Sequence, residues 1–222
     1  MSYNLDLIKE KVKNTKVLFF DLDGTLIDTE HLYFRFWKEA CKYYGYEISD
    51  NDALSMRSRE KKSAEEFLSK ISDGLLDYET TRNKRIELMN AYLSTHPIQL
   101  KDGAIDILKL FKSQNKQIYI VTANTIEKSQ RIINSVGIEE YIDGIISAKD
   151  VKRGKPFPDV YLYACEITKT KPNEVVVFED SPNGLMSSSA AGCFTVMVED
   201  LTPFEKEMNY VDGAISSLIE LS

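Results

Sequence analysis

The 222-residue chain contains 43% hydrophobic and 28% charged residues, a composition typical of folded globular proteins that excludes an intrinsically disordered chain. Its 35 acidic and 28 basic side chains give a net charge of −7, the wrong sign for a protein that neutralises nucleic-acid phosphates. No apolar run approaches the ~18 residues that a membrane-spanning helix needs. We therefore expect neither a nucleic-acid partner nor a membrane partner.

The amino-terminal stretch and the cysteines both predict a cytoplasmic protein. Residues Met1–Asn14 mix both charges and lack the apolar run and small-residue cleavage site of a signal peptide. The cysteines Cys41, Cys165 and Cys193 are odd in number and widely spaced, which favours reduced core thiols over a disulfide framework or a zinc site. The sequence leaves the oligomeric state open, and a monomer is compatible with it.

Short apolar runs recur along the chain after a predicted amphipathic helix around Leu5, Ile8 and Val12. Continuous apolar runs, rather than alternating ones, are typical of parallel strands buried on both faces. Helical patterns over 104–112 and 127–136 separate some of these runs. The alternation predicts an α/β fold with a doubly wound, Rossmann-like parallel sheet. The predicted strands are Val17–Phe20, Ile118–Val121, Ile145–Ile146, Val175–Phe178 and Thr195–Val198.

One long segment, residues 31–97, has no strand-like run and is charged and helical in composition, as over 57–68 and 82–93. It follows the first strand, at the sheet edge where open α/β folds bind ligands. We therefore predict a helical cap domain at 31–97, inserted into a core domain made of 1–30 and 98–222. A helical layer that only packs is the alternative, because most charged runs are solvated helix faces.

Two acidic pairs stand at the ends of predicted strands. Asp21 and Asp23 follow the first strand and precede Gly24, while Glu179 and Asp180 end the fourth. Buried carboxylates are costly and repel one another unless a cation offsets them. Because parallel strands bring these ends to one edge, the pairs predict a shared divalent ion such as Mg²⁺, which also binds substrate phosphate. A turn with a helix cap is the alternative for the second pair.

Two further features suit a phosphate at the same edge. Thr122, Ala123 and Asn124 follow a strand and precede a helix, and free backbone N–H groups at a helix N-terminus form a ready anion site. A plain N-cap is the alternative for Thr122. Lys155 lies in a loop with two prolines, where its ammonium would balance carboxylates and meet phosphate oxygens. Otherwise it is an ordinary surface lysine.

Together, these segments resemble the haloacid dehalogenase-like hydrolase superfamily, in its helical-cap branch that includes β-phosphoglucomutase and small-molecule phosphatases. The resemblance covers about Lys16 to Val198. Its most specific part is the Asp-Leu-Asp-Gly-Thr-Leu-Ile-Asp-Thr stretch that begins at Asp21. The Lys-Pro-Phe-Pro-Asp stretch at Lys155 and the Glu-Asp-Ser stretch at Glu179 are moderately specific.

The resemblance implies a phosphatase of a small phosphorylated metabolite, for example a sugar phosphate. Asp21 would attack phosphorus to form an aspartyl-phosphate, while Asp23 would protonate the leaving oxygen and then activate water. Mg²⁺ would be bound by Asp21, Asp180 and the backbone carbonyl of Asp23, with Glu179 in support. The phosphoryl group would be held by Thr122, the amide of Ala123, Lys155 and Asn124.

Other activities within this superfamily fit the sequence less well. A mutase is the main alternative: Arg35–Trp37 and Ser58-Arg59-Glu60 match its pattern, with Arg59 gripping a second phosphate. That pattern, however, has a histidine where this chain has Tyr33. Asp23 argues against a dehalogenase, which needs no proton donor, and against a phosphoaspartate signalling module, whose phosphoryl group must persist. A phosphonate-cleaving enzyme would need a Schiff-base lysine in the cap.

Overall fold

The computed structural model describes residues 3–56, 59, 61–201 and 208–222. The chain forms two compact units, one made of Met1–Asp28 with Gln99–Ser222 and the other of Thr29–Ile98. Among the described residues, none of the helices combines the length and the apolar character that crossing a membrane requires.

The first unit is built on a six-stranded sheet in which all neighbouring strands run parallel. The strand order is β3-β2-β1-β4-β5-β6. The predicted doubly wound parallel sheet is therefore confirmed, and the short β6 is a strand that the apolar pattern does not reveal. The strands are β1 (Val17–Phe20), β2 (Gln117–Thr122), β3 (Gly144–Ser147), β4 (Val175–Glu179), β5 (Phe194–Val198) and β6 (Gly213–Ile215).

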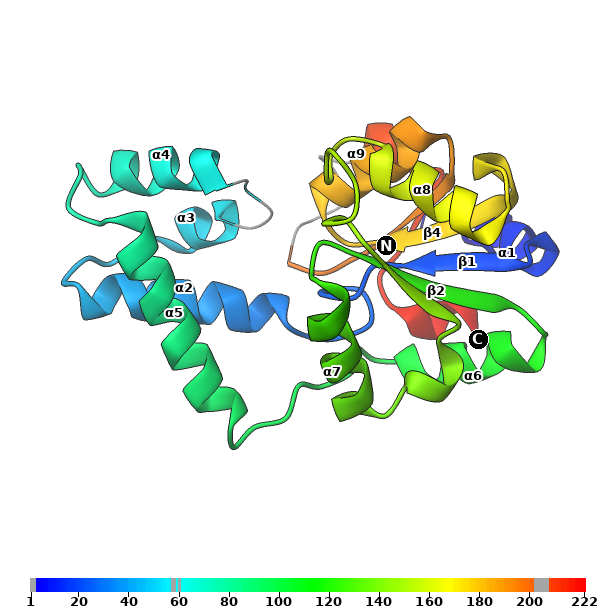
Figure 1. Ribbon diagram of the computed structural model, residues 1–222, viewed down its shortest axis with the longest axis horizontal. Helices are drawn as coiled ribbons and strands as arrows, with labels where there is room; N and C mark the ends of the chain where they lie inside the picture. The colour runs from blue at the N-terminus through cyan, green and yellow to red at the C-terminus, as the bar shows by residue number, and fades with distance from the viewer. Residues whose placement is uncertain (1–2, 57–58, 60, 202–207) are drawn as a thin grey trace. The chain divides into compact units, whose positions relative to one another are not determined.

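Helices cover both faces of this sheet (Figure 1): α8 and α9 pack on one face, α6 and α7 on the other, and α1 contacts β6. Helix α6, for example, turns an apolar stripe inward that contains Ile107, Leu108 and Phe111. The helices are α1 (Leu5–Asn14), α6 (Ala104–Ser113), α7 (Ile126–Val136), α8 (Asp159–Thr168) and α9 (Pro182–Ala191), with 3₁₀ turns η1 (Glu139–Tyr141), η2 (Pro172–Glu174), η4 (Met208–Tyr210) and η5 (Leu218–Leu221).

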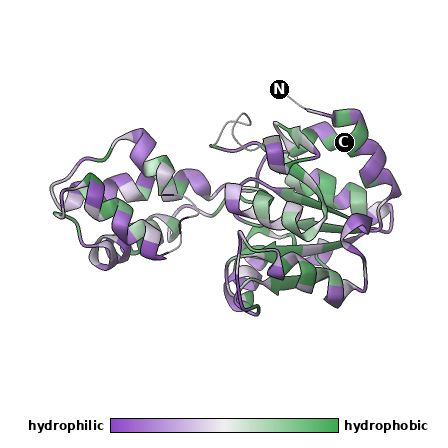
Figure 2. Ribbon diagram, turned by 90° about the horizontal axis from the view of Figure 1, so that it is seen from above, coloured by the Kyte–Doolittle hydropathy of each residue, from purple (hydrophilic) through white to green (hydrophobic). Residues whose placement is uncertain are grey.

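The central strands β1 and β4 are buried along their whole length, and the strands are the apolar centre of this unit in Figure 2. Phe20 stacks on Phe178 of β4 with ring centroids 4.5 Å apart. Full burial of one such side chain stabilises the fold by about 1.5–3 kcal/mol. This packing therefore holds β1 and β4 together at the centre of the sheet.

The order of the strands reverses between β1 and β4, because the chain adds β2 and β3 on one side of β1 and β4 to β6 on the other. Ligands of open α/β sheets bind at the carboxyl ends of the strands beside such a switch point. The backbone N–H of Asp21 continues the β1–β4 pairing by donating to the carbonyl of Phe178, at 2.9 Å. The residues that follow the two strands are thereby placed side by side.

Helices joined by turns and loops make up the described residues of the second unit. It contains α2 (Glu30–Tyr43), α3 (Asp50–Ser55), α4 (Lys61–Ile71) and α5 (Tyr78–Leu93). Ser49 and Asp52 form a capping box at the start of α3, and Asp77 caps α5. Trp37, Cys41 and Leu68 belong to its buried core. The helix predicted over 82–93 is confirmed as part of α5. The helix predicted over 57–68 is present from Lys61, and residues 57, 58 and 60 lie outside the described residues.

All three cysteines are free and buried, as predicted. A different buried polar group, Lys116, ties α1 to the start of β2. Its ammonium donates hydrogen bonds to the carbonyls of Val12 and Thr15, both at 2.6 Å, and of Lys13 at 3.3 Å. These carbonyls end α1, where the last helical C=O groups lack partners within the helix. Burial lowers the pKa of Lys116, and the carbonyls stabilise the buried ammonium by accepting hydrogen bonds from it.

We expect Lys116→Met to lower the free energy of unfolding by about 1–3 kcal/mol, because it removes the ammonium donor from the carbonyls of Val12 and Thr15. The control is Lys109→Met on the exposed face of α6, which should change the value by less than about 0.5 kcal/mol. Urea unfolding of both variants measures the difference. Equal effects of the two substitutions would contradict this role of Lys116.

Candidate active site

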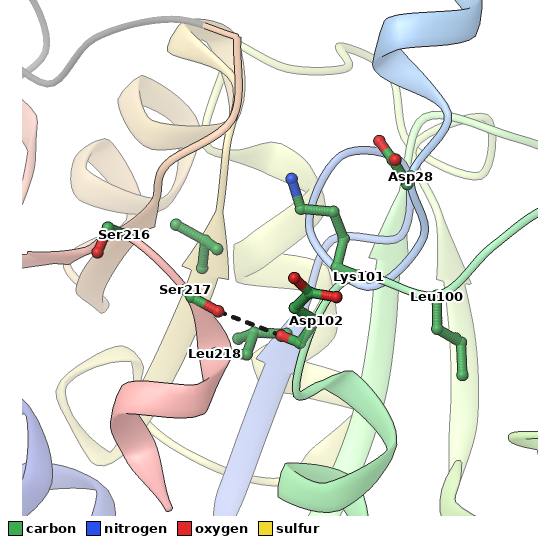
Figure 3. A pocket seen from close by; sticks show the side chains of 8 residues that line it. Asp28, Leu100, Lys101, Asp102, Ser216, Ser217 and Leu218 are labelled. Atoms are coloured by element: carbon green, nitrogen blue, oxygen red, sulfur yellow. Dashed lines mark hydrogen bonds between the residues drawn. The ribbon is translucent and has the colours of Figure 1, made fainter.

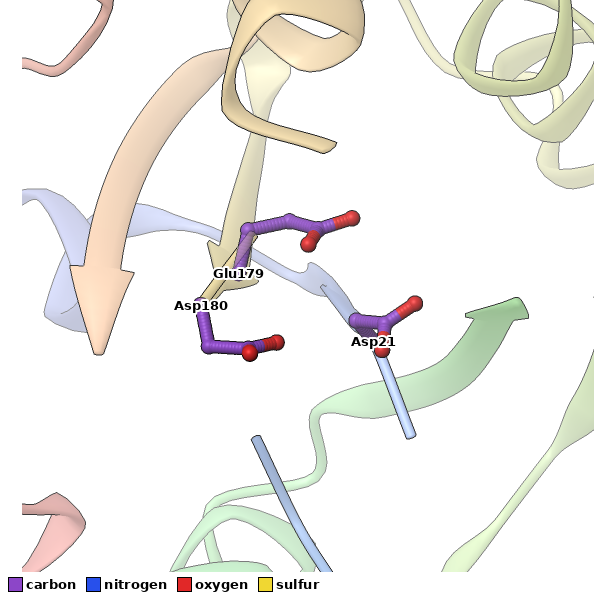
Figure 4. Close-up of side chains that lie close together, drawn as sticks. All are labelled: Asp21, Glu179 and Asp180. Carbon is purple, nitrogen blue, oxygen red and sulfur yellow. The ribbon is translucent and has the colours of Figure 1, made fainter. Parts of the chain in front are cut away.

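Three buried carboxylates meet at the β1–β4 switch point (Figure 4). Asp21 follows β1, Glu179 ends β4 and Asp180 comes next, and each offers an oxygen within 4.8 Å of the others. Their residue exposures are 8%, 0% and 1%. Because like charges at this separation repel strongly out of water, the group is stable in ionised form only with positive charge beside it.

The loop after β1 is shaped to receive Asp180. Gly24 has a φ of 81°, and a Cβ there would lie 2.3 Å from Asp180 Oδ2. Both the left-handed backbone and the close approach of the carboxylate therefore require glycine. The next residue, Thr25, donates from its hydroxyl to Asp180 Oδ1 at 3.2 Å. The Asp-Gly-Thr sequence thus positions the carboxylate of another strand.

Lys155 supplies the positive charge within the group. Its ammonium lies 2.6 Å from Asp21 Oδ1 and 3.0 Å from the carbonyl oxygen of Val121, and it also contacts Glu179 Oε1. Burial alone would lower the pKa of Lys155, but the charges of Asp21 and Glu179 outweigh this effect and raise the pKa. Lys155 is therefore a charged member of the cluster, and the alternative of an ordinary surface lysine is wrong.

One ammonium does not balance three carboxylates. Burial, opposed by Lys155, raises the pKa of Asp21 to about 8. A further cation would stabilise the ionised form of Asp21, because an opposite charge within a few ångströms favours ionisation. When all three carboxylates are ionised, the single positive charge of Lys155 neutralises only one of their three negative charges. A divalent ion would neutralise the remaining two. The donor set, which consists of hard oxygens, therefore fits a hard divalent cation.

Glu179 is held by several donors. Its Oε1 accepts a hydrogen bond from the Tyr161 hydroxyl at 2.5 Å as well as the contact from Lys155. Its Oε2 accepts from Ser181 Oγ at 3.3 Å. A Cβ at Gly184 would lie 2.0 Å from this carboxyl group, so only a glycine lets the backbone of α9 come this close to Glu179. The contacts fix both oxygens of Glu179 relative to Lys155.

Thr122 ends β2, which pairs with β1, and Ala123 and Asn124 follow it. Thr122 is buried, and its Oγ1 accepts from the backbone N–H of Asn124 at 3.1 Å. The N-cap of α7 is Thr125, whose hydroxyl accepts from the N–H of Lys128. The alternative of Thr122 as a plain N-cap is therefore wrong, and Ala123 is exposed at the turn.

Asp23 and Asn124 are brought together by the two loops. The side-chain amide of Asn124 donates to Asp23 Oδ2 at 2.6 Å and accepts from the ammonium of Lys128 at 2.8 Å. The sequence predicts a phosphate contact for Asn124, whereas its amide in this structure contacts Asp23. A phosphate contact of this side chain stays a prediction.

Arg59 is the one predicted site residue that belongs to the helical unit. Its side chain is exposed, donates to Ser63 Oγ at 3.0 Å and lies 4.2 Å from the ring of Phe67. Ser58 and Glu60, which complete the mutase-like pattern, lie outside the described residues. A phosphate contact of Arg59 stays a prediction.

Two residues of the site, Tyr161 and Lys128, were missed by sequence reasoning. Tyr161 lies among the buried positions of α8, where a tyrosine hydroxyl requires a hydrogen-bond partner. Lys128 is in the first turn of α7, where the positive end of the helix dipole disfavours a cation. A tyrosine within a helix that packs on the sheet and a lysine in the first turn of a helix are both unusual enough to be noticed. Neither feature identifies the residue to which the side chain bonds.

A separate pocket of about 210 Å³ lies near the ends of β5 and β6 (Figure 3). Ser217 Oγ donates across it to the carbonyl of Asp102 at 3.3 Å, and Lys101 is paired with Asp200 at 2.7 Å. None of the three clustered carboxylates lines it. The lining residues are Asp28, Leu100, Lys101, Asp102, Val198, Ser216, Ser217 and Leu218.

We expect Tyr161→Phe to lower the free energy of unfolding by about 1.5–3 kcal/mol, the usual contribution of a hydrogen bond to a charged group. The control Tyr163→Phe removes a hydroxyl from the same helix at a partly buried position, and should cost less than about 0.5 kcal/mol. Urea unfolding measures both. A Tyr161→Phe variant as stable as the control would contradict the importance of this bond.

Comparison with known proteins identifies the family. A family model described as haloacid dehalogenase-like hydrolase matches residues 18–198. The chain is 30% identical to hexitol phosphatase A of Escherichia coli K12, covering 93% of each chain. It is 29% identical to validoxylamine A 7'-phosphate phosphatase of Streptomyces hygroscopicus subsp. limoneus, over 82% of this chain and 84% of that protein.

Solved structures show the same fold. The crystal structure of β-phosphoglucomutase from Clostridium difficile superimposes with a TM-score of 0.73 at 21% sequence identity, covering 94% of this chain and 93% of that one. At this identity the likeness concerns the fold only. With the family model matched from β1 to β5 and the acidic cluster at the switch point, the chain belongs to the haloacid dehalogenase-like hydrolases.

Proposed function

We propose that the protein is a Mg²⁺-dependent phosphatase that hydrolyses a small phosphomonoester, of the sugar or polyol phosphate class, through an aspartyl-phosphate on Asp21. The observation that carries this proposal is the pairing of Asp21 with Lys155 inside the buried acidic cluster. The substrate class is supported by the names of two relatives, hexitol phosphatase A and validoxylamine A 7'-phosphate phosphatase.

The residues that would hold Mg²⁺ are Asp21 and Asp180, with the backbone carbonyl of Asp23, and Glu179 would support them. Their oxygens match the ligands that this ion prefers. When bound, the ion supplies positive charge to the nucleophile and to the transferring phosphoryl group. Glu179 contributes mainly through Lys155 and Tyr161, which already occupy its Oε1.

In the first step, Asp21 attacks phosphorus and the bond from phosphorus to the ester oxygen breaks. The electron pair of that bond stays on the departing oxygen, which takes a proton from Asp23. Lys155 balances the charge of the nucleophile and of the phosphoryl oxygens. Thr122 and the N–H of Ala123 are in the strand-end turn from which they would donate to the same oxygens.

In the second step, water attacks phosphorus of the aspartyl-phosphate. Asp23, now ionised, accepts a proton from this water, and the bond from phosphorus to Asp21 breaks. Inorganic phosphate is released and the carboxylate of Asp21 is regenerated, while Asp23 is protonated for the next cycle. The two carboxylates therefore have separate tasks, one as nucleophile and one as proton carrier.

The helical unit is proposed to act as a cap that closes over the substrate and excludes water. Its exposed Arg59 is the cationic residue that we assign to substrate contact. We propose a cytoplasmic enzyme, because its three cysteines are free and buried, as is typical of proteins in a reducing compartment.

A phosphosugar mutase is the second candidate. The resemblance to such a mutase calls for a histidine where this chain has Tyr33 in α2. The guanidinium of Arg85 lies over the ring of Tyr33, 4.9 Å from the ring centroid. Incubation with β-glucose 1-phosphate and a bisphosphate primer distinguishes the two activities. Formation of the 6-phosphate without release of inorganic phosphate would favour the mutase.

We expect the wild-type protein to release inorganic phosphate from at least one member of a panel of sugar and polyol phosphates in the presence of Mg²⁺. Asp21→Asn should reduce that rate below about one thousandth, because the amide is a poor nucleophile. Asp150→Asn, at an exposed loop position, is the matched control and should retain activity. Failure of the whole panel, or an active Asp21→Asn variant, would reject the proposed function.

We expect Mg²⁺ to stabilise the fold. At a concentration 100 times its Kd, binding contributes about 2.7 kcal/mol, which raises the unfolding midpoint by roughly 5–10 °C for a chain of this size. Asp180→Asn should lose most of this shift, whereas Asp150→Asn should keep it. Thermal scans of metal-free and Mg²⁺-loaded protein provide the measurement. An unchanged shift in Asp180→Asn would place the ion elsewhere.

A further inference from the structure

We propose that Asn124 and Lys128 form a positioning pair for Asp23, in which Lys128 orients the Asn124 amide and the amide anchors the proton-carrying carboxylate. The inference rests on the proposed function, because it concerns how Asp23 delivers its proton. It assigns no substrate contact to either residue.

Asn124 has all four of its polar groups engaged. Its backbone N–H donates to Thr122 Oγ1 at 3.1 Å, and its carbonyl accepts from Ser147 Oγ at 2.6 Å. Its side-chain Oδ1 accepts from Lys128 Nζ at 2.8 Å, and its Nδ2 donates to Asp23 Oδ2 at 2.6 Å. Ser147, at the end of β3, is buried. The residue is therefore held by β2, β3 and α7 at once, and its side chain has little freedom to leave Asp23.

The chemistry of the two neighbours fixes which way the amide points. An ammonium can only donate, so Lys128 must face the amide oxygen. Asp23 accepts on the oxygen that faces Asn124, so the amide NH₂ must lie on that side. Flipping the amide would set two donors against each other and an oxygen against a carboxylate. Lys128 thus fixes the orientation of the amide in which Asn124 donates to Asp23.

A neutral amide suits a group that must both give and take a proton. Ionised Asp23 accepts the amide N–H at Oδ2, and protonated Asp23 can still accept it there while the proton is on Oδ1. The anchor therefore survives both halves of the cycle. Lys128 acts on Asp23 through the Asn124 amide, which contacts both side chains.

The position of Lys128 is not explained by helix stability. It lies in the first turn of α7, where cations are disfavoured by about 0.3–1 kcal/mol. A residue that breaks a local preference and has a specific partner is a candidate for a functional role.

The test compares two substrates whose leaving groups differ in their need for a proton. An alkyl phosphate, such as a sugar phosphate, releases a basic alkoxide that must be protonated, whereas p-nitrophenyl phosphate releases a stable phenolate. The parameter kcat/KM reports the step in which the leaving group departs, because that step precedes hydrolysis of the phosphoenzyme. Asp23→Asn supplies the reference pattern for loss of the general acid.

We expect Asn124→Ala to lower kcat/KM for the alkyl phosphate by about 10- to 100-fold, within the range of general acid catalysis, and for p-nitrophenyl phosphate by less than about 3-fold. Lys128→Met should show the same selectivity with a smaller loss, and Lys128→Arg should restore part of it. Asn134→Ala, at an exposed position of α7, is the control and should match the wild type for both substrates.

Equal losses for the two substrates, or wild-type kinetics in both Asn124→Ala and Lys128→Met, would overturn the positioning role while leaving the phosphatase intact. If Asn124→Ala fails to fold, Lys128→Met and Lys128→Arg decide the question alone, because Lys128 is only half-buried. A wild-type protein that hydrolyses neither substrate would reject the proposed function itself, and this inference with it.

Discussion

The balance between Lys155 and the carboxylates at the β1–β4 switch point is the interaction on which the rest of the site depends. Three acidic side chains are almost wholly removed from water there, a placement that would be strongly unfavourable without a cation in contact. Lys155 reaches Asp21 and Glu179 together and also binds the carbonyl of Val121 on β2. Its charge is thus fixed to the strands that carry the acids.

The surrounding fold provides the rigidity that this arrangement needs. Phe20 and Phe178 stack directly before Asp21 and Glu179, so the two strands cannot slide without opening the core. Gly24 and Gly184 admit the carboxylates at distances that no other residue allows. The strain of bringing like charges together is therefore resisted by packing, and the remaining negative charge is available to a metal and a phosphate.

Much of the fold follows from the sequence because its signals are local. Unbroken apolar runs identify five of the six strands, and acidic residues at two strand ends locate the switch point. The short strand β6 has only Gly213, Ala214 and Ile215, too few residues for a pattern. The partners of Tyr161 and Asn124 are similarly invisible, since each hydrogen bond joins residues distant in the chain and depends on side-chain packing. Tyr161 reaches Glu179 across 18 positions, and Asn124 reaches Asp23 across 101.

The net charge of −7 and the affinity for phosphate proposed here are compatible because they act over different distances. At physiological ionic strength, exposed charges are screened beyond about 8 Å, so surface acids repel long polyanions but barely affect a buried site. Within the site, the nearest charges determine whether a phosphate dianion can bind. Lys155 contacts the acids directly, and Lys128 adds a cation that reaches Asp23 through the Asn124 amide. An acidic protein can therefore exclude nucleic acid from its surface and still accept a small phosphate dianion, provided that a divalent ion completes the balance.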